Sequence, residues 1–338
     1  MVVCAAVVHG EVRPLLPADV QHHAERNTPT AISKSGPDVA DIVAPMELSP
    51  PNGRTQWAVV AVLTVVACAL RWSLAVDGAL DVDAINLGLA ARDFDVLQYR
   101  PHPPGYAGYV LLLKMLGLLA PGAAAVELAC LGSLVCGAAS VPAAYWAARQ
   151  MAGADAWSGP LAAAALAAVN PVLWYYGADG QSHAAEGLAT LLVFGLVVRA
   201  HHRHTRAAVV LAVAALALAG GLRPNIVALG APLAVWLLWR RPAADWFLSL
   251  GAAALACLAW AWPSMAAAGG LDSYRRASEA LYGAYLGSYS VGGELAVVNL
   301  SKALWSLVWA GPPLLVLCWR GLAAAPWRLP WLSRQIPL

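Results

Sequence analysis

Two aspartates near the start of the chain have the type and spacing of residues that handle a proton. Asp81 and Asp83 lie two positions apart in a polar segment, residues 76–109, that holds five aspartates and follows the first long apolar run. A carboxylate in such a place can accept a proton from an acceptor hydroxyl or bind a divalent metal. We expect Asp83 to be the catalytic residue, with Asp81 as the second candidate; a solvated acidic loop is the alternative.

The same segment ends in a stiff corner that brings a histidine toward these acids. His102 precedes two prolines, Gly105 and Tyr106. The prolines fix φ, and each restricts the residue before it to an extended conformation. We therefore expect His102 and Tyr106 to bind substrate beside Asp83. A corner with a purely structural role is equally compatible with the sequence.

Three more titratable residues follow a helix break near the middle of the chain. Asp179, His183 and Glu186 stand at i, i+4 and i+7, which places them on one stripe of a helix at the start of an apolar run. A buried acid is costly in a membrane protein unless it is paired or hydrated, so the stripe predicts a polar cavity that binds substrate. One histidine with two acids is a weak metal signal. We therefore assign no metal ligand and no cofactor, and keep a divalent metal as the alternative.

An arginine between two short apolar runs completes the candidate site. Arg223 lies in the stretch Gly-Gly-Leu-Arg-Pro-Asn at 220–225. Its planar guanidinium matches the oxygens of a phosphate group. We expect Arg223 to bind an anionic headgroup; an interfacial arginine that extends to water is the alternative.

The elements that hold these residues are predicted to be membrane helices. The chain is 60% hydrophobic and 12% charged, whereas soluble domains contain about 25% charged residues. A helix of about 20 apolar residues crosses a bilayer, so the sequence predicts an all-α polytopic transmembrane bundle of about 8–9 spans, with interfacial helices in its first external loop. Apolar runs recur near 57–76, 105–120, 124–148, 158–175, 184–200, 206–222, 225–239, 245–268 and 296–319.

Charge and composition divide the chain and orient it. Residues 1–56 are polar and rich in proline, which predicts a disordered tail before a membrane module at 57–320; a short tail at 321–338 is compatible with truncation. Basic residues at 199–206 and 240–241 favour the cytoplasm, which makes 76–109 and 269–295 external loops. The parity of the crossings then requires that 105–120, which carries Lys114, is oblique or re-entrant. The net charge of +2, without a basic stripe, argues against nucleic acid as a partner.

Taken together, these residues resemble a known family. The stretches that begin at Asp83 (Asp-Ala-Ile-Asn-Leu), Phe94 (Phe-Asp-Val) and Pro101 (Pro-His-Pro-Pro-Gly-Tyr) are similar to the first external loop of the GT-C superfamily of membrane glycosyltransferases. The resemblance is closest to the bacterial branch related to protein O-mannosyltransferases and the lipid A aminoarabinose transferase. The stretches at 170–177, 221–224 and 269–274 also resemble that branch, so the resemblance covers 57–320.

The resemblance implies a function and roles for the residues. The donor would be a sugar on a polyprenyl phosphate carrier. The acceptor would be a hydroxyl of a glycan, lipid or protein at the external face of the bacterial inner membrane. Asp83 would be the catalytic base or orienting acid, His102 and Arg223 would face the carrier phosphate, and Asp179 and Glu186 would line the cavity. Such a donor needs no nucleotide-binding fold, in keeping with a sequence without a glycine-rich Rossmann motif.

Two other functions are compatible with the sequence. A transporter or flippase of a lipid-linked or anionic solute is expected to show inverted repeats and charges in the middle of broken helices. We find no convincing repeat, and the acids cluster outside the apolar runs. An inactive fragment of such a transferase would explain the unusual ends of the chain, since relatives have further spans. The sequence does not specify the sugar, the acceptor or the need for a metal.

Overall fold

The computed structural model describes residues 52–74, 81–152 and 156–289, together with positions 297, 298, 300, 301 and 304. All of them belong to one structural unit, Pro50–Leu338. The regular elements among these residues are helices, with no β-strand, which confirms the all-α prediction. Most of the predicted disordered tail, the tail at 321–338 and most of the run at 296–319 lie outside the described residues.

Eight apolar helices account for every predicted run before residue 268. Among the described residues four helices are long and apolar enough to cross a membrane: α2 (Gly53–Leu74), α5 (Ala125–Met151), α8 (His183–Arg203) and α11 (Ala243–Ala267). Four others are apolar but shorter: α4 (Ala107–Leu119), α6 (Ser158–Val169), α9 (Arg206–Ala219) and α10 (Asn225–Leu238). The helices are those of a membrane protein, but the predicted count of 8–9 spans is not confirmed.

The run at 158–175 folds as two helices rather than one. α6 ends at Val169, and α7 (Pro171–Tyr176) begins two residues later. Pro171 has no amide hydrogen with which to continue α6. The side chain of Asn170 accepts hydrogen bonds from the amides of Val172 and Leu173, at 2.9 and 3.0 Å, and so caps α7. The chain then runs through an irregular segment, 177–182, before α8 begins.

Two predicted boundaries are corrected. The first helix begins at Gly53, so residues 53–56 belong to α2 and not to a disordered tail. The predicted external loop 269–295 contains a 19-residue helix, α12 (Leu271–Tyr289). Gly269 and Gly270 have positive φ values of 75° and 121°, which end α11. The glycines are a genuine break, but the residues after them return to a helical conformation.

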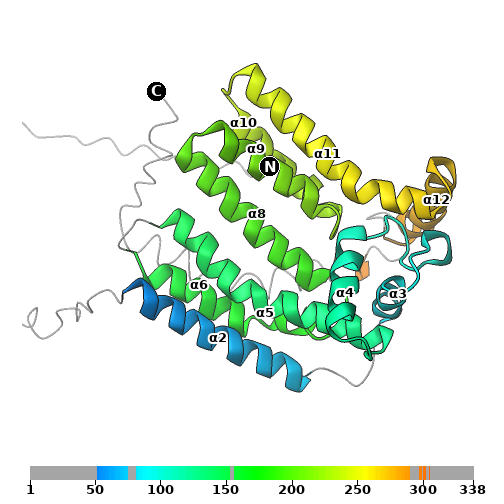
Figure 1. Cartoon of the computed structure of the whole chain (residues 1–338), viewed down its shortest axis with the longest axis horizontal. Helices are drawn as coiled ribbons and strands as arrows, with labels where there is room; N and C mark the ends of the chain where they lie inside the picture. Colours follow the sequence, from blue (N-terminus) through cyan, green and yellow to red (C-terminus); the bar gives the residue numbers. More distant parts are fainter. Residues whose placement is uncertain are drawn as a thin grey trace, which may run out of the picture. The chain divides into compact units, whose positions relative to one another are not determined.

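The helices pack so that their connections gather at two ends. α5 packs against α2, α6 and α8, and α9 packs against α8, α10 and α11 (Figure 1). One end, which we call the basic end, joins the α8–α9 and α10–α11 connections: Arg206 Nε lies 2.6 Å from Asp245 Oδ1, and Arg241 Nη1 donates to His204 O at 2.8 Å. The other, the site end, carries α3 (Val82–Ala90), α4 and α12.

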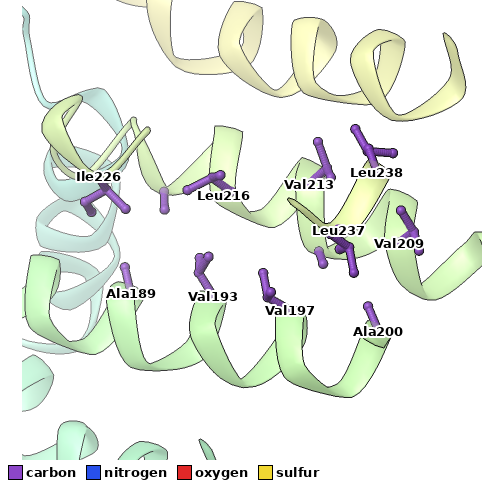
Figure 2. Packing of buried hydrophobic residues seen from close by; sticks show 12 residues of the cluster. Ala189, Val193, Val197, Ala200, Val209, Val213, Leu216, Ile226, Leu237 and Leu238 are labelled. Atoms are coloured by element: carbon purple, nitrogen blue, oxygen red, sulfur yellow. The ribbon is translucent and has the colours of Figure 1, made fainter. Parts of the chain in front are cut away.

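A core of valine and leucine side chains joins α8, α9 and α10 (Figure 2). Val193 and Val197 of α8 face Val213 and Leu216 of α9, and Leu237 of α10 completes the contact. A spacing of four residues places the α8 valines on one stripe of their helix. This core fixes the mutual position of the three helices, and therefore of the polar residues at their ends.

Candidate active site at one end of the helical bundle

Asp83 lies in the first turn of α3, on a helix held against the bundle. The side chain of Asp81 caps this helix by accepting a hydrogen bond from the amide of Asp83 at 2.9 Å. Gly88, one turn later, packs so closely on the backbone of Ala125 that a Cβ atom would not fit. Asp83 is thereby placed at the site end with its side chain 43% exposed, while Asp81 has a capping contact and does not join the other predicted site residues.

His102 connects Asp83 to Tyr106. Its Nδ1 lies 3.3 Å from Asp83 Oδ1, and its Nε2 lies 3.1 Å from the Tyr106 hydroxyl. The imidazole side chain is only 16% exposed. Gly105, whose φ is +99°, allows the turn between the two rings and lies directly against Ser264 of α11. The corner thus has the position that the sequence predicts for it.

The surroundings of Asp83 favour its charged form. The hydrogen bond from His102 is the largest influence and lowers the pKa of Asp83. Partial burial acts in the opposite direction, while the nearby Arg223 and His183 add to the lowering. Asp83 therefore remains a carboxylate well into mildly acidic conditions.

Arg223 is held by side chains from α8. Its Nε lies 3.2 Å from Glu186 Oε2, and its Nη1 lies 2.8 Å from Nδ1 and 3.0 Å from Nε2 of His183. It therefore donates to the ring nitrogen that carries no proton. Asn225 Nδ2 donates to the other Glu186 oxygen at 2.6 Å. No described residue accepts a hydrogen bond from Nη2 of Arg223, whose side chain is 22% exposed.

A backbone contact brings these two groups together. The amide of Gly108, at the start of α4, donates to the carbonyl of Gly221 at 2.9 Å. The guanidinium carbon of Arg223 consequently lies 5.8 Å from the ring centre of Tyr106, within cation–π range. We call the six residues so joined the site cluster: Asp83, His102, Tyr106, His183, Glu186 and Arg223.

Asp179 does not lie on the predicted helical stripe. α8 begins at His183, so Asp179 precedes the helix in the irregular segment. It is 1% exposed. Its Oδ1 accepts the amide of Gln181 at 2.9 Å, and none of the described residues bonds to Oδ2. Burial raises the pKa of Asp179, and this effect exceeds the opposing influence of the Gln181 amide and of His183.

The described residues contain no group of three or more histidine, cysteine or acidic side chains arranged to hold a metal ion. The carboxylates of the site cluster are instead engaged by histidine, arginine and asparagine. Glu186 already accepts from Arg223 and Asn225. These side chains can transfer a proton and bind an anion.

An apolar cavity of about 650 Å³ adjoins the site cluster. Its walls come from α4, α8, α9 and α11, and include Leu222, the neighbour of Arg223, and Ala107, the neighbour of Tyr106. Lys114 is the one charged residue in its lining, and the Lys114 ammonium lies 6.0 Å from the centre of the Phe94 ring. A polar cluster therefore meets a hydrophobic hollow at the ends of the helices.

Three contributors at the site end were not predicted as site residues. Asn225 positions Glu186, Lys114 lines the cavity, and the Tyr274 hydroxyl of α12 donates to the carbonyl of Pro104 at 3.2 Å. Asn225 carries a signal in the sequence, since it follows Arg223 and Pro224 at the start of a helix. The other two depend on tertiary packing, which local spacing does not encode.

Comparison with known proteins adds no assignment to this geometry. No family model, no curated protein and no solved structure matches the chain. The GT-C resemblance consequently rests on the sequence motifs themselves.

Proposed function

We propose that this protein is a membrane glycosyltransferase that moves a sugar from a polyprenyl phosphate carrier to an acceptor hydroxyl. One observation carries the proposal: a carboxylate–histidine pair and an arginine lie together at the edge of an apolar cavity. The carboxylate–histidine pair can accept the proton of a hydroxyl, the arginine can bind a phosphate, and the cavity can hold a hydrocarbon chain.

The cavity and Arg223 suit the two halves of a lipid phosphate. Leu222 faces the cavity while the adjacent Arg223 belongs to the site cluster. An isoprenoid chain in the hollow would therefore place its phosphate near the unoccupied Nη2 edge of the guanidinium. Lys114 in the cavity lining adds a second cation for an anionic headgroup that enters sideways from the bilayer.

The bond changes follow from these positions. The acceptor oxygen forms a bond to the anomeric carbon, and the bond from that carbon to the phosphate oxygen breaks with its electron pair on the phosphate. The Asp83–His102 pair takes up the acceptor proton. The phosphate gains one negative charge as it leaves, and Arg223 stabilises that charge. Attack from the opposite face of the sugar gives inversion at the anomeric carbon.

The charge distribution supports an external site. Arginines at the ends of α5, α8 and α10 and at the starts of α2 and α9 gather at the basic end: Arg54, Arg149, Arg203, Arg206, Arg240 and Arg241. Such a bias favours the cytoplasm. Alternate crossings by α2, α5, α6, α8, α9, α10 and α11 then place the site end outside. In this topology α4 does not cross, in agreement with the parity of the predicted runs, and the membrane is a bacterial inner membrane.

The test is donor consumption by membranes that contain the full chain. The donors are a panel of polyprenyl-phosphate hexoses and pentoses, and the product measured is free polyprenyl phosphate, because the membranes supply the acceptor. We expect release by the wild type and strongly reduced release by Asp83→Asn, with Asp272→Asn, an exposed acid on α12, as the matched control. Full activity of a folded Asp83→Asn protein would sink the site assignment.

The two other functions give distinct outcomes in the same experiment. A transporter or flippase moves the intact lipid-linked sugar between leaflets and leaves the carrier loaded. An inactive protein leaves every donor unchanged while remaining folded and able to bind polyprenyl phosphate. Either result would contradict the proposed transfer.

A further inference from the structure

Both nitrogens of His102 have a partner, and the two partners differ in kind. Nδ1 faces a carboxylate, Asp83 Oδ1, at 3.3 Å, and Nε2 faces a hydroxyl, that of Tyr106, at 3.1 Å. A carboxylate beside one ring nitrogen fixes the proton on that nitrogen and leaves the lone pair on the other. Nε2 is therefore the acceptor, and the Tyr106 hydroxyl donates to it.

Asp83 itself is poorly suited to take a proton from an alcohol. The hydrogen bond from His102 lowers the pKa of Asp83, and a weaker base gives less driving force for proton transfer. Its Oδ1 is already directed at Nδ1 of His102. The carboxylate can, however, stabilise a positively charged imidazole.

We propose that His102, through Nε2, is the general base of the reaction and that Asp83 is a positioning residue that acts through His102. This inference rests on the proposed function and assigns the proton to one atom. The acceptor hydroxyl takes the place that the Tyr106 hydroxyl now has at Nε2. Its proton passes to Nε2 as its oxygen bonds to the anomeric carbon and the phosphate leaves with the electron pair of the broken bond. The imidazolium formed is paired with Asp83 and later releases its proton to water.

The charged and titratable groups around His102 come from several elements. Asp83 of α3 and the Tyr106 hydroxyl contact the ring directly, and Arg223 lies over the Tyr106 ring. Further groups at the same end are His183 and Glu186 of α8 and Tyr274 of α12, which bonds to Pro104. His183 is a second histidine at this end of the bundle, so the test must separate it from His102.

The test is the pH dependence of kcat/KM for release of polyprenyl phosphate from the donor that the wild type uses. A histidine base gives an activity that falls toward acid within about pH 5–8. We expect this acidic limb of the pH–rate profile in the wild type and in His183→Gln, although the His183→Gln variant is slower. We expect His102→Gln to lose at least about 100-fold in rate and His202→Gln, an exposed histidine at the basic end, to match the wild type.

Asp83→Asn separates a positioning role from a structural one. Without the carboxylate the imidazolium is less stable, so the acidic limb should move to lower pH while the rate falls. A merely structural role would reduce the rate and leave the limb in place. Binding of sugar-free polyprenyl phosphate at wild-type affinity shows that each variant is folded; if His102→Gln fails this check, the limb shift of Asp83→Asn decides alone.

Two results would overturn the inference while leaving the proposed function intact. One is a wild type without a limb between about pH 5 and 8, which points to a carboxylate base. The other is a folded His102→Gln protein that retains activity within ten-fold of the wild type, a smaller loss than the about 100-fold expected of a missing base. Absence of donor turnover by the wild type would instead refute the proposed function.

Discussion

Two arginines bind the segment 170–186, and their hydrogen-bond partners differ: Arg71 contacts its first part, at Leu173, and Arg223 contacts its last part, at Glu186. Arg71 of α2 is fully buried and donates to three backbone carbonyls: those of Ala67 at 2.9 Å, Ala167 at 3.2 Å and Leu173 at 3.4 Å. Arg223 is partly exposed and is bound by side chains, and its neighbour Leu222 lines the cavity. The first has only backbone partners among the described residues, and the second has titratable ones.

The difference in their partners separates a structural arginine, Arg71, from an arginine that can bind a ligand, Arg223. Ala167 lies in the last turn of α6, where carbonyls lack partners within the helix, so Arg71 satisfies a carbonyl that the helix break leaves free. No side-chain nitrogen of Arg223 donates to a described backbone carbonyl, and one of these nitrogens, Nη2, has no described acceptor. An arginine that is fully used by the backbone stabilises the fold, whereas one with an open edge can bind a ligand.

The largest effect on the transfer rate is expected for substitution of Arg223. Arg223→Gln should lower transfer about 100- to 1,000-fold, because it removes the charge that stabilises the leaving phosphate. Thermal unfolding of the detergent-solubilised variant should remain close to that of the wild type. Arg203→Gln, exposed at the basic end, serves as the control. If Arg223→Gln unfolds, Arg223 has a structural role like that of Arg71, and the proposed difference between the two arginines is wrong.

Arg71→Met should have the opposite effect, with a loss of stability and little loss of transfer activity. It keeps the apolar length of the side chain but leaves the carbonyl of Ala167 in the last turn of α6 without its donor, which costs about 2 kcal/mol of unfolding free energy. An SDS titration of the purified protein measures this loss, with Arg54→Met at the exposed start of the same helix as the control. The fraction that folds should transfer sugar at a rate near that of the wild type; a specific loss of turnover would place Arg71 in the site.

Glu186→Gln sharpens the comparison within the site. The glutamine oxygen can still accept one hydrogen bond, but the charge that fixes Nε of Arg223 is lost. We expect transfer to be about ten-fold slower, because the guanidinium is less well placed. Steady-state kinetics with the donor should show the loss in kcat; unchanged kinetics would mean that Glu186 does not orient Arg223.

The smallest effect concerns the two aspartates and depends on pH. Burial raises the pKa of Asp179, so its contribution to stability is present below about pH 4 and is lost as pH rises through its raised folded value. Asp179→Asn cannot ionise and should be more stable than the wild type at pH 7 by about 1 kcal/mol, with no difference at acid pH. Thermal unfolding at both pH values measures this.

Asp83 provides the contrast in sign. Its pKa is lowered, so its contribution to stability is present above about pH 4 and is lost as pH falls through the folded value. Asp83→Asn should therefore be less stable than the wild type at neutral pH and approach it in acid. Parallel behaviour of the two variants would contradict the difference between a paired carboxylate and an unpaired one.

Local patterns in the sequence predicted much of the architecture. Apolar runs predicted the eight apolar helices described above, and the position of Arg223 between two apolar runs identified it as a candidate site residue. The site cluster was predictable because its members lie beside helix breaks that proline and glycine signal. Asp179 was misplaced by a helical spacing that continues through 177–182, where the structure has no helix. Arg71 could not be recognised, since two of its acceptors lie 96 and 102 residues away in the chain.

The short hairpin of α9 and α10 has a consequence for the surrounding lipid. Each helix has 14 residues and so spans about 21 Å, against a hydrocarbon core of about 30 Å. In the proposed topology, the bilayer beside these two short helices becomes thinner locally to avoid hydrophobic mismatch. Arg223, at the tip of the hairpin, would then contact lipid headgroups that lie deeper than those of the surrounding outer leaflet. A carrier phosphate could reach the site there without leaving its own leaflet.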